Sequence, residues 1–121
     1  MLSSHEQWLK DKSGKEAVLS NIDLSHMDLS GRDLRYSKFT DSDLICTDFS
    51  NTNLECAYFV RTNLVETIFL SADLSYACFN ASIINNVDLT LSKLYYTVFD
   101  NVSLKPIDSD YTKLIVKEVI L

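Results

Sequence analysis

Large apolar residues recur at every fifth position through most of this 121-residue chain. Residues five apart lie roughly 140° apart around an α-helix, and an odd step along a strand reverses the face. All members of the series can therefore point inward only if the backbone turns a corner about every five residues. The series runs without exception through Leu24, Leu29, Leu34, Phe39, Leu44, Phe49, Leu54, Phe59, Leu64, Phe69, Leu74, Phe79, Ile84, Leu89, Leu94, Phe99 and Leu104.

A small or β-branched residue stands two positions before most of these large ones, as Thr47 does before Phe49. The large residue points inward, the residue beside it points outward, and the small residue points inward again. This alternation is the pattern of a very short strand that ends at a bend. An Asp or Asn often lies between the two, and its side chain is expected to hydrogen-bond the backbone at the bend. This role would explain how the chain turns with two Gly and one Pro in all.

A second period of 20 residues sets the architecture, since Phe39, Phe59, Phe79 and Phe99 repeat at that interval. Four bends in 20 residues close one turn of a four-sided coil. Equivalent residues of successive coils then stack about 4.8 Å apart, with a phenylalanine ladder inside. The sequence predicts an all-β solenoid of about four to five coils, roughly 22 Å tall.

The stretches "SNTNLECAYF" (50–59) and "SADLSYACFN" (71–80) resemble the A(D/N)LXX signature of the pentapeptide-repeat family. The resemblance covers residues 17–106 and implies a right-handed quadrilateral parallel β-helix. It also implies an alternative function, because some members imitate DNA and bind DNA gyrase, which they inhibit or protect from quinolones.

Both ends depart from the repeat. Residues 1–16 are expected to form a cap with a short helix from about Ser4 to Lys12, and Arg32 in an inward position predicts an irregular first coil. Residues 107–121 are expected to cap the last coil, pair with a second copy as a homodimer, or do both. Near-helical spacing slightly favours a helix there over a strand. Its apolar residues are Tyr111, Leu114, Ile115, Val119 and Ile120.

No motif points to catalysis or to a cofactor. Cys46, Cys56 and Cys78 fit neither a zinc pattern nor a redox motif, and no cysteine is expected in repeat register with His5 or His26. No stretch is apolar enough for a signal peptide or a membrane span, which predicts a cytosolic protein without membrane contact.

The middle of the chain is acidic, with Arg61 as its one cation between residues 40 and 92. This charge disfavours direct nucleic-acid binding and keeps the gyrase alternative open, although Asp33, Asn53, Asp73 and Lys93 are expected to stack as a mixed row. The acidic residues are Asp41, Asp43, Asp48, Glu55, Glu66, Asp73 and Asp88.

Two neighbouring outward columns are aromatic or apolar instead. One contains Tyr36, Cys56, Tyr76 and Tyr96, and the other contains Lys38, Tyr58, Cys78 and Val98. Such a composition is typical of a protein interface, but neighbouring tyrosines can also simply shield strand edges. The sequence thus predicts a non-enzymatic protein-binding module whose partner is unidentified, with DNA gyrase as one candidate.

Overall fold

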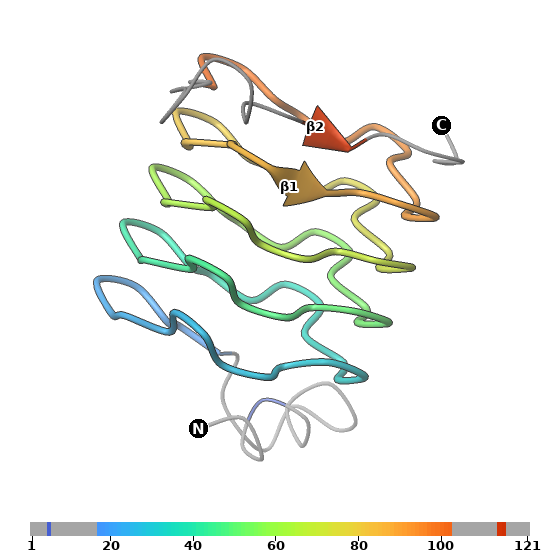
Figure 1. The fold of residues 1–121 in the computed structure, drawn as a ribbon, viewed down its shortest axis with the longest axis horizontal. Helices are drawn as coiled ribbons and strands as arrows, with labels where there is room; N and C mark the ends of the chain where they lie inside the picture. The colour runs from blue at the N-terminus through green and yellow to red at the C-terminus, as the bar shows by residue number, and fades with distance from the viewer. Residues whose placement is uncertain (1–4, 6–16, 103–113, 116–121) are drawn as a thin grey trace.

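The chain winds into a solenoid of stacked, four-sided coils (Figure 1). The computed structural model describes His5, residues 17–102 and residues 114–115. Residues 20 apart pair as parallel bridges, from Val18 with Lys38 to Cys78 with Val98. The predicted period of 20 is therefore confirmed, and the fold is a parallel β-helix.

Each side of a coil is too short to form a regular strand. It contributes single paired residues, and hydrogen bonds run from coil to coil: Leu34 N donates to Asn53 O (2.8 Å) and Asn53 N donates to Arg32 O (3.0 Å). In the described residues only β1 (Val87–Asp88) and β2 (Leu114–Ile115) are longer, at two residues each. The stack is held by a parallel ladder one or two residues wide on each side.

Each corner is made by a residue with positive φ. It lies two positions after one of the large inward Leu, Ile or Phe residues, which we call central residues. Cys56, for example, has a φ of 59°, and Ala57 N donates to Leu54 O (3.0 Å) across the turn. Positive φ at the third residue is what a type II β-turn requires. The corner residues are Asn21, His26, Gly31, Tyr36, Asp41, Cys46, Asn51, Cys56, Arg61, Glu66, Ser71, Tyr76, Ala81, Asn86, Leu91, Tyr96 and Asn101.

None of these corner residues is Val, Ile or Thr. A β-branched side chain is strongly disfavoured at positive φ, whereas Asn, Asp and Gly tolerate it. The corners thus exclude the side chains that tolerate positive φ least, and Gly31 is the only corner glycine among the described residues.

The Asp and Asn side chains stabilise these turns, as predicted. Asp48 Oδ1, for instance, accepts a hydrogen bond from Ser50 N (2.9 Å). Asp43 shows no such bond, and Ile45 N donates instead to Ser25 Oγ of the preceding coil (3.1 Å). The same bond to the second following amide is made by Asp23, Asp28, Asp33, Asn53, Asn63, Asp73 and Asp88.

Two phenylalanine ladders fill the core. Phe59 is fully buried and stacks on Phe39 and Phe79, with ring centroids 5.0 and 4.7 Å apart. It meets Phe49 and Phe69 of the other ladder edge to face, at 5.8 and 5.6 Å. Stacked and edge-to-face contacts are both favourable ring geometries. The 20-residue period therefore gives the rings of each ladder favourable contacts with their neighbours.

The first coil is regular in its backbone, which makes the prediction of an irregular coil wrong. Asp28 pairs with Asp48 and Asp33 pairs with Asn53 in the same parallel register as later coils. Arg32 is exposed, and Met27 is 44% exposed, so these large side chains leave the core without disturbing the turns.

His5 has a helical backbone conformation, and the rest of the predicted helix from Ser4 to Lys12 lies outside the described residues. Its side chain is fully buried, and Nδ1 accepts a hydrogen bond from Ala17 N (2.7 Å). Ser37 Oγ lies 3.5 Å from Nε2. The His5 ring therefore provides a hydrogen-bond acceptor for the backbone amide of Ala17 at the start of the first coil.

At the other end, the preference for a helix is wrong at Leu114 and Ile115, which form strand β2. This strand pairs in parallel with β1, Val87 opposite Leu114 and Asp88 opposite Ile115 (Figure 1). The pairing gives hydrogen-bond partners to backbone N–H and C=O groups at the exposed edge of β1. A helix at this position would leave those groups unpaired. Leu114 lies 27 positions after Val87, so the 20-residue register has ended by β2. Tyr111, Val119 and Ile120 lie outside the described residues.

Candidate functional site

An exposed aromatic strip follows one corner of the solenoid. We call it the tyrosine ridge. It consists of the corner residues Tyr36, Cys56, Tyr76 and Tyr96 and the adjacent paired residues Tyr58, Cys78 and Val98. Tyr58 pairs with Cys78, and Cys78 pairs with Val98, so these three residues stack as one column.

The ridge side chains stay accessible although they stack. Tyr76 and Tyr96 lie with ring centroids 5.3 Å apart and ring planes at 17°. Tyr76 is nevertheless 57% exposed and Tyr96 78% exposed, while Cys56 and Cys78 are half-buried. Mutual stacking therefore leaves most of these two rings in contact with water.

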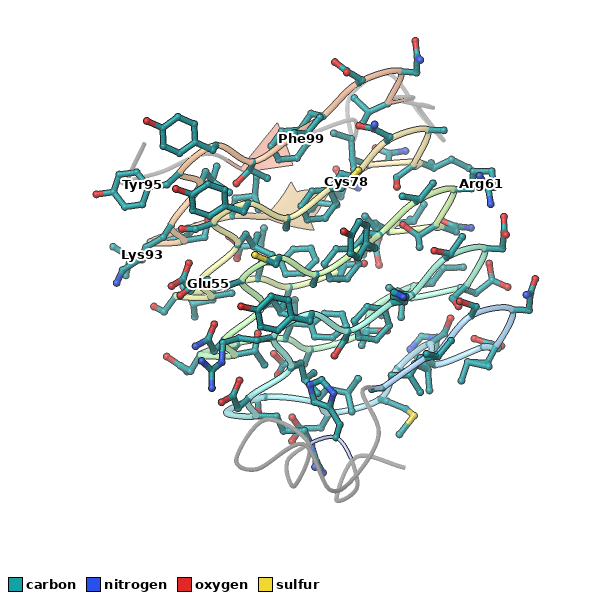
Figure 2. All side chains as sticks on the ribbon, turned by 180° about the vertical axis from the view of Figure 1, so that it is seen from behind. Glu55, Arg61, Cys78, Lys93, Tyr95 and Phe99 are labelled. Atoms are coloured by element: carbon teal, nitrogen blue, oxygen red, sulfur yellow. The ribbon has the colours of Figure 1, made fainter. Side chains whose placement is uncertain are left out.

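Sequence reasoning missed Tyr95, which is 42% exposed and extends the ridge next to Tyr96. It follows the central Leu94, at the position that Glu55 occupies in an earlier coil. Figure 2 shows Tyr95, Lys93 and Glu55 along one edge of the solenoid and Arg61 at the opposite edge. The position directly after each central residue was the signal that could have found it.

The predicted acidic residues do not gather into one surface. Asp41 binds Arg61 through two hydrogen bonds (2.7 and 3.0 Å), which lower the pKa of Asp41. Glu66 accepts a hydrogen bond from the Cys46 thiol (3.2 Å) at another corner. Asp43, Asp48 and Asp88 occupy paired positions on other sides of the coil.

Glu55 and Asp73 are the members of the predicted acidic set that lie beside the ridge. Glu55 directly precedes Cys56, and Asp73 pairs with Asn53 and Lys93 in the predicted mixed row. Burial raises the pKa of the Cys56 thiol, and the charges of Glu55 and Asp73 raise it further. The middle of the ridge therefore has two carboxylates beside Cys56, and Lys93 lies one coil beyond Asp73.

The thiols are poorly placed for chemistry. Burial, and then Glu66, raise the pKa of Cys46, as burial and two carboxylates do for Cys56. A thiol with a raised pKa stays protonated at neutral pH and is a weak nucleophile. The three cysteines are free, and none stacks on another.

The sequence predicted no metal site, but the expectation that no cysteine is in repeat register with His26 is wrong. His26 lies one coil before Cys46 in the same corner column, and Glu66 follows one coil later. Within the described ranges, however, no group of three or more His, Cys, Asp or Glu side chains converges as metal ligands. A helix long and apolar enough to cross a membrane is likewise absent from that part of the chain.

The family is established by its repeat. Residues 15–51 and 42–80 match the family model for pentapeptide repeats, with eight copies. The chain belongs to the pentapeptide-repeat family. This membership agrees with the right-handed β-helix that the resemblance implied. A comparison of this pentapeptide-repeat protein with curated protein sequences finds no match.

The fold is shared with a solved pentapeptide-repeat protein. HetL of the cyanobacterium Nostoc sp. strain PCC 7120, involved in heterocyst differentiation regulation, is 23% identical with a TM-score of 0.66, and the match covers 75% of this chain and 46% of HetL. Rfr23 of the cyanobacterium Cyanothece 51142 is 17% identical (TM-score 0.49; 84% and 98% covered). QnrB1, a plasmid-mediated fluoroquinolone resistance protein, is 22% identical (TM-score 0.37; 73% and 48% covered). This pentapeptide-repeat protein thus spans less than half of HetL.

Acidification is expected to destabilise this pentapeptide-repeat protein through its turn carboxylates. The Ser30 hydroxyl lowers the pKa of Asp28, and Arg61 lowers that of Asp41, from 3.8 in each case. A carboxyl group with a lowered pKa in the folded state stabilises the fold above 3.8, and this contribution is lost as the pH falls through the folded pKa.

The free energy of unfolding, measured with urea, should therefore be lower at about pH 3 than at about pH 5. Asp28→Asn keeps the side-chain shape but does not titrate, so it should reduce this difference. Equal stability of the unmodified protein at both pH values would contradict the expectation.

Proposed function

We propose that this chain is a non-enzymatic protein-binding module that contacts its partner through the tyrosine ridge. The observation that carries the proposal is the exposure of Tyr76 and Tyr96 on an otherwise regular coil. The turn does not require tyrosine, because Ser71 and Ala81 occupy equivalent corners with nearly the same φ. The ridge is thus a feature that the fold itself does not explain.

The backbone that carries the ridge is rigid, which favours binding of a partner protein. Tyrosine offers a large contact area with few rotatable bonds, and it is enriched in protein interfaces. The ridge backbone is fixed by bonds such as Tyr76 N to Tyr95 O (2.8 Å). A side chain on a fixed backbone loses little conformational entropy on docking.

A role as a DNA-mimicking modulator of gyrase is the alternative, and the charge distribution supports it less well. Duplex DNA presents one charge about every 1.7 Å. Here the carboxylates are dispersed over several sides, Asp41 is neutralised by Arg61, and Lys93 interrupts the row that contains Asp73. The cytosolic location and the homodimer through residues 107–121 stay predictions.

The ridge is tested by the double variant Tyr76→Ser and Tyr96→Ser. Serine already occupies a corner at Ser71, so the fold should be retained, while the partner captured from a lysate of the source cells should be lost. Leu70→Ser is the matched control, because Leu70 is 37% exposed on a different side of the coil. An unchanged set of captured proteins in the double variant would contradict the proposal.

A further inference from the structure

We propose that the tyrosine ridge binds an extended, arginine-rich segment of a partner protein. This inference rests on the proposed function and specifies the chemistry of the partner. It is carried by the combination of exposed tyrosine rings and nearby carboxylates along one corner of the solenoid.

Two carboxylates, those of Glu55 and Asp73, lie beside the middle of the ridge. Glu55 and Asp73 are close enough to Cys56 for both of their charges to raise the pKa of its thiol, after burial. Neither carboxylate forms an ion pair with a residue of the described ranges, unlike Asp33 and Asp41. No direct ion pair in the described part of the chain therefore holds either carboxylate, and Lys93 lies one coil beyond Asp73 in the same row.

Of the cations near the ridge, Arg35 is bound to Asp33, and Lys38 and Lys93 lie beside its first and last coils. Arg61 lies at the opposite edge of the solenoid (Figure 2) and holds Asp41 at 2.7 Å. Arg35 holds Asp33 through two bonds of 2.9 and 2.8 Å. Between residues 40 and 92 the sequence contains no further Lys or Arg. Between the coils of Lys38 and Lys93, the charged residues beside the ridge are therefore Glu55 and Asp73.

Arginine fits both components of this surface. Its planar guanidinium stacks on aromatic faces and at the same time donates hydrogen bonds to carboxylates. The paired rings of Tyr76 and Tyr96 still expose most of their surface. Asp73 provides an acceptor three residues before Tyr76, and Glu55 provides one a coil earlier. A purely apolar segment would use the rings but form no ion pair with Glu55 or Asp73.

The length of the ridge sets the size of the segment. Tyr36 and Tyr96 are three coils apart, which is roughly 14 Å at the spacing between strands, or about four residues of extended chain. Alternate residues of an extended segment point to the same side, so two or three arginines could reach the ridge.

The experiment uses the full chain and three fluorescently labelled peptides, Arg-Ser-Arg-Ser-Arg and the same peptide with Leu or Glu in place of Arg. Anisotropy titrations at low salt should show the Arg peptide binding about tenfold more tightly than the Leu peptide, with the Glu peptide weakest. The preference for Arg should diminish at about 0.5 M salt, because exposed charges are then screened.

Variants locate the contact. The double variant Glu55→Gln and Asp73→Asn should weaken Arg-peptide binding about tenfold, and Tyr76→Ser with Tyr96→Ser should abolish it. Glu66→Gln is the matched control, since Glu66 lies in the corner column of Cys46, away from the ridge, and it should leave binding unchanged.

Two results would overturn the inference: equal binding of the Arg and Leu peptides, or no loss in the Glu55→Gln, Asp73→Asn variant. If the Leu peptide alone binds and the tyrosine variant removes it, the ridge remains a protein-binding surface but its preference for cations is wrong. If the tyrosine variant also keeps the partner captured from the lysate, the proposed function itself is wrong.

Discussion

Replacing Phe59 by alanine is expected to lower the free energy of unfolding by about 3–5 kcal/mol. The ring is fully buried between Phe39 and Phe79 and touches both rings of the second ladder. Its removal leaves a cavity in the centre of the solenoid, where the paired backbones cannot close in. Urea unfolding followed by circular dichroism measures the loss.

Phe59→Leu is the matched control, because Leu54 and Leu64 occupy the same central position on neighbouring sides. It should cost less than the alanine variant, since leucine fills much of the space. Equal stability of the alanine and leucine variants would show that ring stacking and core volume at this position contribute little.

Replacing Ser71 by valine is expected to lower the free energy of unfolding by about 1–3 kcal/mol, although the residue is exposed. Ser71 is a corner residue with a φ of 57°, and a β-branched side chain is strained at this angle. Its amide also holds the next coil by donating to Thr90 O (2.9 Å), so a shifted corner would disturb the ladder.

Ser71→Gly separates backbone strain from the loss of the hydroxyl group, because glycine tolerates positive φ. Its stability should lie within about 1 kcal/mol of the unmodified protein. If valine and glycine proved equally stable in urea unfolding, the corner conformation at Ser71 would be wrong.

The repeat made the coil predictable. The step of five residues, the period of 20 and the small inward companions such as Thr47 follow from which side chains must share the interior. The bonds of Asp and Asn to the following turn were also predictable, because they are local interactions between residues two apart.

Features that depend on long-range contacts were not predictable in the same way. The pattern around His5 does not show that its ring accepts a bond from Ala17 N, 12 residues later. Strand β2 formed where near-helical spacing slightly favoured a helix, because pairing with β1 outweighed that local preference. The positive φ of the corner residues could have been inferred from the sequence, because no β-branched residue occurs at the corner positions.

The candidate site was predictable as two columns, but its exposure was not. The 20-residue register places Tyr58 beside Cys78 from the sequence alone. How much of each ring remains in water depends on side-chain packing, which leaves Tyr96 at 78% exposed. The sequence therefore could not separate edge shielding from an interface.

Site-specific photo-cross-linking in the source cells tests the binding role of the ridge most directly. A benzophenone amino acid replaces Tyr76 in one variant and Leu70, on a different side of the coil, in another. We predict a cross-linked protein adduct from position 76 and none from position 70. An adduct from position 70 alone, or none from position 76, would contradict the tyrosine ridge as the contact surface.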